Sequence, residues 1–171
     1  PCTANYAFSK ENALEDYTLD RIAREIDDAE KTLAEMLGVK AVSFAYPCCQ
    51  TFVGRGRQVK TYVPLVAERF ETGRLGRNEA ANDPLVCDLS QLLAQGSDGA
   101  SFADLKALAD GAVTEGRWLI LCGHEIAGAG YQTTSVKTLE ALCRYAADPA
   151  RGIWLDTVGH IGQYVARSRK Q

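Results

Sequence analysis

The stretch Trp118-Leu119-Ile120-Leu121-Cys122-Gly123-His124-Glu125-Ile126 decides the fold of this chain. Its apolar run from Trp118 to Cys122 is short and unbroken, and it ends at a glycine. Such a run is typical of a strand that is buried on both faces of a parallel sheet. His124 would then lie at the carboxyl end of a buried strand, where the ligand-binding and catalytic groups of α/β folds collect. A histidine that only caps the next turn is the alternative, and spacing alone does not separate the two interpretations.

Helical and strand patterns alternate on both sides of this segment. Apolar residues at helical spacing predict helices over 14–37, 62–70, 101–115, 136–145 and 157–165. Short apolar runs predict strands near 41–45, 85–88, 118–122 and 153–155. This alternation favours an α/β fold of βα units with a parallel sheet. The strands are too few for an eight-stranded barrel, so the sheet is either open or part of a barrel.

The composition is that of one ordinary globular domain, residues 1–171. The chain is 46% hydrophobic and 24% charged, with a net charge of −3. The absence of a basic field argues against nucleic acid as a partner. The apolar runs are far shorter than the ~18 residues of a membrane span. The sequence does not settle the oligomeric state, and a homo-oligomer remains open.

The six cysteines are scattered along the chain and show no zinc-knuckle spacing. We interpret them as reduced thiols, which favours the cytoplasm weakly. The chain begins at Pro1 without a methionine, so a secreted or cell-envelope protein remains open.

A second strand-end loop follows the predicted strand near 41–45. It runs from Cys48 to Arg57 and is too long for a simple connection. Its Gly54-Arg55-Gly56 lacks the third glycine of a dinucleotide-binding fingerprint. Two loops that follow parallel strands meet on the same side of the sheet, which predicts a βα-type active site there.

Three segments of the chain resemble the polysaccharide deacetylases, the NodB-homology domain of carbohydrate esterase family four. They are Phe44-Ala45-Tyr46-Pro47, Leu121-Cys122-Gly123-His124 and Trp154-Leu155-Asp156-Thr157-Val158-Gly159. The likeness runs from about Leu14 to the end and matches the C-terminal two thirds of such a domain. It implies a partial barrel of the distorted, seven-stranded (β/α) type, with parallel strands inside and helices outside. It also implies a metal-dependent hydrolase of carbohydrate metabolism that removes acetyl groups from N- or O-acetylated carbohydrate, acting on carbon–nitrogen bonds other than peptide bonds.

The resemblance assigns roles to six residues. His124 would be the general acid that protonates the leaving group, and Leu121 would line the pocket for the acetyl methyl. The backbone N–H of Cys48 would stabilise the oxyanion beside Tyr46 and Pro47, which would contact the substrate. An acidic residue often tunes the acid histidine in this family, and Asp88 is the candidate for this role.

Two family motifs are absent. The only Asp-Asp pair, Asp27-Asp28, lies on the polar face of the helix predicted over 14–37 and is not the family's motif, and no His-x-x-x-His pair occurs, so no metal ligands are expected in this chain. The catalytic base and the ligands of a divalent metal, with zinc favoured, are expected upstream of Pro1, and the chain as given is expected to be inactive alone. Ala45 and Cys49 replace an arginine and a glycine of the family pattern. The alternative function is a non-catalytic carbohydrate-binding or structural domain derived from the same fold.

Overall fold

The computed structural model describes residues 10–76, 78–128 and 130–169. Its internal contacts divide the chain into two compact units. Unit 1 comprises Pro1–Leu75 and Asp88–Leu92, and unit 2 comprises Gly76–Cys87 and Leu93–Gln171. The described residues form a mixed α/β structure with five α-helices and short, mainly parallel strand pairs, and they contain no closed barrel. The expectation of a single domain stays a prediction.

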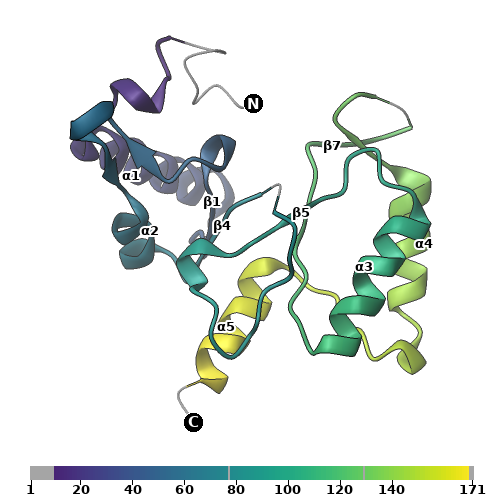
Figure 1. The fold of residues 1–171 in the computed structure, drawn as a ribbon. Coiled ribbons are helices and arrows are strands. Elements are labelled where there is room, and N and C mark those ends of the chain that lie inside the picture. Colours follow the sequence, from purple (N-terminus) through teal and green to yellow (C-terminus); the bar gives the residue numbers. More distant parts are fainter. Residues whose placement is uncertain (1–9, 77, 129, 170–171) are drawn as a thin grey trace. The chain divides into compact units, whose positions relative to one another are not determined.

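Unit 1 contains two α-helices and two strand pairs (Figure 1). Its elements are α1 (Leu19–Leu37), β1 (Ser43–Ala45), β2 (Phe52–Val53), β3 (Lys60–Thr61), α2 (Val63–Arg69) and β4 (Thr72–Arg74), with 3-10 turns η1 (Leu14–Asp16), η2 (Pro47–Cys49), η3 (Gly56–Gln58) and η4 (Leu89–Gln91). Strands β1 and β4 are parallel, with Phe44 opposite Gly73, and β2 and β3 are antiparallel. Helix α1 ends where the sequence predicted, because Gly38 takes the left-handed conformation with φ of 66°.

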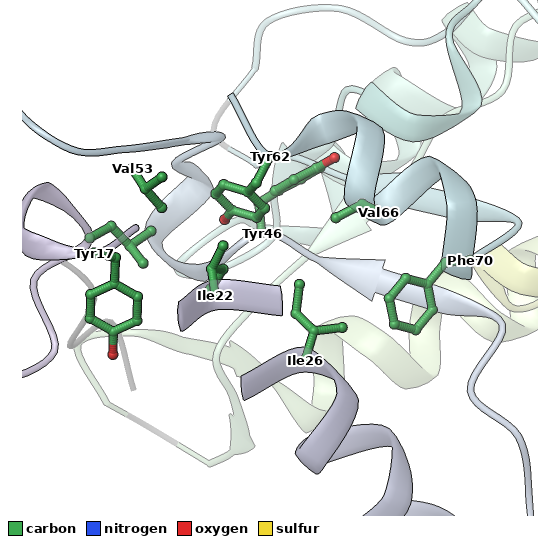
Figure 2. Close-up of a cluster of buried hydrophobic side chains, with 9 residues drawn as sticks. Tyr17, Ile22, Ile26, Tyr46, Val53, Tyr62, Val66 and Phe70 are labelled. Atoms are coloured by element: carbon green, nitrogen blue, oxygen red, sulfur yellow. The ribbon is translucent and has the colours of Figure 1, made fainter. Parts of the chain in front are cut away.

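The hydrophobic core of unit 1 lies between α1, α2 and the β1 strand end. Figure 2 shows Ile22 and Ile26 of α1 close to the rings of Tyr46 and Tyr62. The Tyr46 and Tyr62 ring centroids are 5.4 Å apart, a distance at which aromatic pairs attract each other. Burial of these side chains removes apolar surface from water and holds the end of β1 in place.

Unit 2 contains the other three α-helices, and two parallel strand pairs. Its elements are β5 (Gln95–Gly96), α3 (Phe102–Glu115), β6 (Leu121–Cys122), β7 (Glu125–Ala127), β8 (Thr133–Ser135), α4 (Val136–Ala146), η5 (Pro149–Arg151) and α5 (Val158–Ser168). Strand β5 pairs with β6, and β7 pairs with β8. The hydroxyl of Ser101 and the carboxylate of Asp104 form a reciprocal capping box at the start of α3, where the sequence predicted a helix to begin.

Two predicted strands are wrong. Residues 85–88 form a turn instead, in which the backbone N–H of Leu85 donates to the Asp83 carboxylate at 2.9 Å. The side chains of Leu85 and Val86 are 78% and 79% exposed, so this apolar run is not buried in a sheet. Residues 153–155 are not in a strand either, and the side chains of Trp154 and Leu155 are exposed. Both runs have the composition of a strand but lack a strand partner in the described structure.

No helix in the described part of the chain is both long enough and apolar enough to cross a membrane. This agrees with the sequence, whose longest helical segment carries charges along one face.

Candidate functional site

The candidate site lies in unit 2 at the carboxyl end of β6. Strand β6 ends at Cys122, and Gly123 and His124 follow directly. A Cβ atom on Gly123 would lie 2.6 Å from the Thr134 hydroxyl, 2.7 Å from the Ser97 hydroxyl and 2.9 Å from the Asp98 carboxylate. Any side chain at this position would displace these groups. Glycine therefore permits the three polar side chains to pack against the backbone beside His124.

His124 and Asp98 make two hydrogen bonds with each other. Nδ1 of the His124 ring lies 2.5 Å from Oδ2 of Asp98, and the His124 backbone N–H donates to Oδ1 at 3.1 Å. The His124 side chain is 36% exposed, whereas that of Asp98 is 19% exposed. The carboxylate thus fixes both the main chain and the ring of a histidine that water and solutes can reach.

The second ring nitrogen of His124, Nε2, can accept or donate a proton. When the neutral ring donates Nδ1–H to Asp98, Nε2 carries a lone pair, and when the ring is charged Nε2 carries a proton. The side-chain amide nitrogen of Gln132 lies 3.4 Å from this Nε2. A histidine held through one nitrogen by a carboxylate is the arrangement that general acids and bases use.

The pKa of the Asp98 carboxyl lies below its ordinary value. Burial alone would raise this pKa, but the hydrogen bonds from the His124 side chain and backbone, the His124 charge and the Thr134 hydroxyl together lower it. Asp98 therefore stays ionised at neutral pH and remains an acceptor for Nδ1–H.

Asp98 makes a contact with His124 of the kind that the resemblance suggested for Asp88, whose role stays a prediction. The exposed carboxylate of Asp88 begins η4 in unit 1, where it accepts from the Ser90 backbone N–H and from the Gln91 amide, both at 2.9 Å. Asp98 carries no motif that marks it as a partner of His124. Its segment Gly96-Ser97-Asp98-Gly99 has the composition of a polar loop. The apolar residues Leu92-Leu93-Ala94 shortly before it indicate a buried strand that leads into this loop.

Leu121 is half-buried in β6 and lines a cavity of about 470 Å³ within unit 2. The cavity walls are apolar and come from α3, α4, α5 and the segment that contains Trp154. Leu121 thus borders an apolar space, and its contact with an acetyl methyl group stays a prediction.

The other predicted site residues, Tyr46, Pro47 and Cys48, lie together in unit 1. Tyr46 is buried, and its hydroxyl donates to the Ser90 carbonyl at 2.8 Å. Burial, with a smaller contribution from the Asp88 charge, raises the pKa of Tyr46 to about 12. A phenol held in this way stays neutral and acts as a fixed hydrogen-bond donor.

Pro47 opens the turn η2, in which Cys48 and Cys49 both have positive φ, 49° and 61°. The left-handed conformation favours glycine, so a cysteine side chain strains the backbone at both positions. The expected approach of His124 to Cys48 and Tyr46 stays a prediction.

His160, the other histidine, also pairs with a carboxylate. Its Nδ1 lies 2.6 Å from Oδ2 of Asp156, four residues earlier, and its ring makes an edge contact with Trp154 at 5.8 Å between centroids. The ring is 58% exposed. Because this contact is local to the start of α5, His160 provides a natural control for His124.

The residues present do not form a metal site of their own. Within 10–76, 78–128 and 130–169, no group of three or more His, Cys, Asp or Glu side chains could hold one ion. The metal that the resemblance implies therefore does not fit the described residues, and we derive no step through it.

Comparisons with family models, with curated proteins and with solved structures find no match for this chain. The structure itself defines the class of site: an accessible histidine, oriented by a half-buried carboxylate, at the end of a parallel strand.

Proposed function

We propose that this chain carries the proton donor of a hydrolase that removes acetyl groups from N- or O-acetylated carbohydrate. The observation that carries the proposal is the 2.5 Å contact between His124 and Asp98 at the end of β6. The likeness of three segments to the polysaccharide deacetylases supports the same assignment, and with it a fold that forms part of a distorted (β/α) barrel.

In this proposal His124 protonates the leaving amine or alcohol through Nε2. Asp98 holds the ring by Nδ1, keeps Nε2 directed at the substrate and stabilises the imidazolium before the proton is transferred. The depressed pKa of Asp98 keeps its negative charge in place at neutral pH. We assign this supporting role to Asp98 rather than Asp88, because Asp98 makes the hydrogen bonds to His124.

The remaining roles follow the resemblance. The Cys48 backbone N–H would donate to the oxyanion of the tetrahedral intermediate, next to Tyr46 and Pro47, and Leu121 would contact the acetyl methyl. The catalytic base and the ligands of a divalent metal, with zinc favoured, are placed outside the described residues. Such a metal would supply Lewis-acid activation of water when bound.

The test compares His124→Ala with His160→Ala in the protein as encoded, including any residues that precede Pro1. Both variants remove a histidine that contacts a carboxylate, but only His124 is assigned to catalysis. On an acetylated chitooligomer, His124→Ala should lower kcat by about 10²–10⁴-fold, the usual contribution of a general acid. His160→Ala should retain the activity of the wild type.

A second substrate isolates proton donation. Nitrophenolate leaves without a proton, so His124→Ala should lose much less activity on nitrophenyl acetate than on the oligomer. Equal activity of wild type and His124→Ala on the oligomer would refute the assignment. Equal losses on both substrates would mean that the variant damages the fold or the metal site. Binding of the oligomer without turnover by the wild type would support the alternative, a non-catalytic carbohydrate-binding domain.

A further inference from the structure

Two buried hydroxyl groups lie next to Asp98. Thr134 is 4% exposed and Ser97 is 6% exposed. The two hydroxyl oxygens are 2.7 Å apart, and the Thr134 oxygen lies 3.3 Å from Oδ1 of Asp98. Buried hydroxyls need partners, and these two satisfy each other and the carboxylate.

The direction of these hydrogen bonds follows from the chemistry of the groups. An ionised carboxylate only accepts, so the single hydroxyl proton of Thr134 is donated to Asp98. The bond between the hydroxyls must then run from Ser97 as donor to Thr134 as acceptor. The result is a directed chain, Ser97 to Thr134 to Asp98, which meets the His124 ring at the other carboxylate oxygen.

Backbone contacts from three strands hold the residues of this hydrogen-bond chain in place. The Ser97 N–H, just after β5, donates to the Cys122 carbonyl of β6 at 3.0 Å. The Gly99 N–H donates to the Thr133 carbonyl of β8 at 3.0 Å. Gly123, which follows β6, packs against the same groups, because a Cβ atom at this position would lie within 3 Å of all three polar side chains. The hydroxyls therefore have little freedom to move independently of the strand ends.

We propose that Thr134, with Ser97 as its hydrogen-bond donor, is a positioning residue for His124. It holds Asp98 so that Oδ2 faces Nδ1, and it thereby keeps the neutral ring in the Nδ1–H tautomer with Nε2 available to the substrate. The catalytic meaning of this role rests on the proposed function, but the positioning itself is measurable in the protein without substrate.

The neighbouring residue supplies a matched control. Thr133 is 5% exposed, and its hydroxyl oxygen has no hydrogen-bond partner in the described part of the chain. Thr133→Val and Thr134→Val make the same isosteric change at adjacent buried positions. Only the second removes a donor to Asp98.

The experiment records the imidazole ¹⁵N and ¹H signals of His124 at a pH where the ring is neutral. The imidazole signals of His124 are identified as those that disappear in His124→Ala, and the His160→Gln background removes the signals of the other histidine of this chain. In the parent we expect the Nδ1–H tautomer to dominate. Thr134→Val should lower the ratio of Nδ1–H to Nε2–H by about two- to tenfold, the equivalent of one hydrogen bond. Thr133→Val should leave the ratio unchanged, and Thr134→Ser, which restores a hydroxyl, should recover it.

An unchanged tautomer ratio in Thr134→Val would overturn the proposal, as would equal changes in both valine variants. If Thr134→Val does not fold, Ser97→Ala tests the same proposal, because it removes the hydrogen-bond donor to Thr134. It should also lower the ratio of the Nδ1–H to the Nε2–H tautomer. Failure of the proposed function looks different. In that case the tautomer ratio responds as expected, while His124→Ala leaves deacetylation of the chitooligomer unchanged.

Discussion

The raised pKa of Tyr46 predicts a specific loss of stability at alkaline pH. The side chain is 3% exposed and its hydroxyl donates to the Ser90 carbonyl, so the phenolate is disfavoured in the folded state. Its pKa is about 12, against an ordinary value of 10.0. A difference of this size corresponds to about 3 kcal/mol of folding free energy.

The sign follows from proton linkage. A group whose folded pKa is raised contributes fully below its unfolded pKa, and the contribution is lost as pH rises toward the folded value. Stability from Tyr46 is therefore complete below about pH 10 and is lost between about pH 10 and 12. In this range folding holds the proton on the phenol, whereas unfolding releases it.

The assay is urea denaturation of wild type and Tyr46→Phe at several pH values from neutral to strongly alkaline. Burial also raises the pKa of Tyr62 and Tyr17, so only the difference between the two proteins isolates Tyr46. Below about pH 10 the variant should be less stable by about 1 kcal/mol, because it lacks the hydrogen bond to Ser90. At higher pH the wild type should lose about 3 kcal/mol relative to the variant. Parallel curves for the two proteins would refute the reasoning.

Four further predictions concern backbone and charge. Cys49→Gly should raise the free energy of unfolding by about 0.5–1 kcal/mol, because Cys49 has φ of 61° and glycine adopts this conformation without strain. Gly73→Ala should lower it by about 1–3 kcal/mol, because the new Cβ would lie 2.6 Å from the Ser90 carbonyl oxygen. Gly111→Ala should instead raise the free energy of unfolding by about 1 kcal/mol, because alanine has the higher helix propensity and its Cβ would meet nothing within 4 Å. Urea denaturation of these three variants measures the sign of each change. The pKa of Asp98 is lowered in the folded state, so ionised Asp98 stabilises the fold above its unfolded pKa of about 4. This stabilisation is lost as pH falls through the folded pKa. The difference in Tm between wild type and Asp98→Asn should therefore shrink in acid.

The helices could be predicted from sequence because their signals are local. Gly38 and Gly116 both take the left-handed conformation at a helix end, and the Ser101–Asp104 capping box forms at the predicted start of α3. These features depend on residues within one turn of each other. Tertiary contacts are not needed to find them.

The strands and the site depend on contacts between distant residues. Leu85 and Val86 form an apolar run that is exposed, and nothing in the run itself distinguishes it from a buried strand. His124 was located because it follows a strand directly. Asp98 was not, because it belongs to a polar loop 26 residues earlier, and only the parallel pairing of β5 with β6 brings it to His124.

The interleaved order of the two units has a consequence for how the chain is made. During synthesis β1, α1, α2 and β4 leave the ribosome first, followed by residues 76–87, which belong to unit 2. Leu92 emerges only after these residues. Its backbone N–H donates to the Gly73 carbonyl at 2.8 Å, and its carbonyl accepts from the Leu75 N–H at 2.7 Å. Until that moment β4 has an unpaired edge, which is a site for aggregation. A gene fragment cut after Leu75 would keep this edge permanently, so unit 1 should be expressed only together with the residues that follow it as far as Leu92.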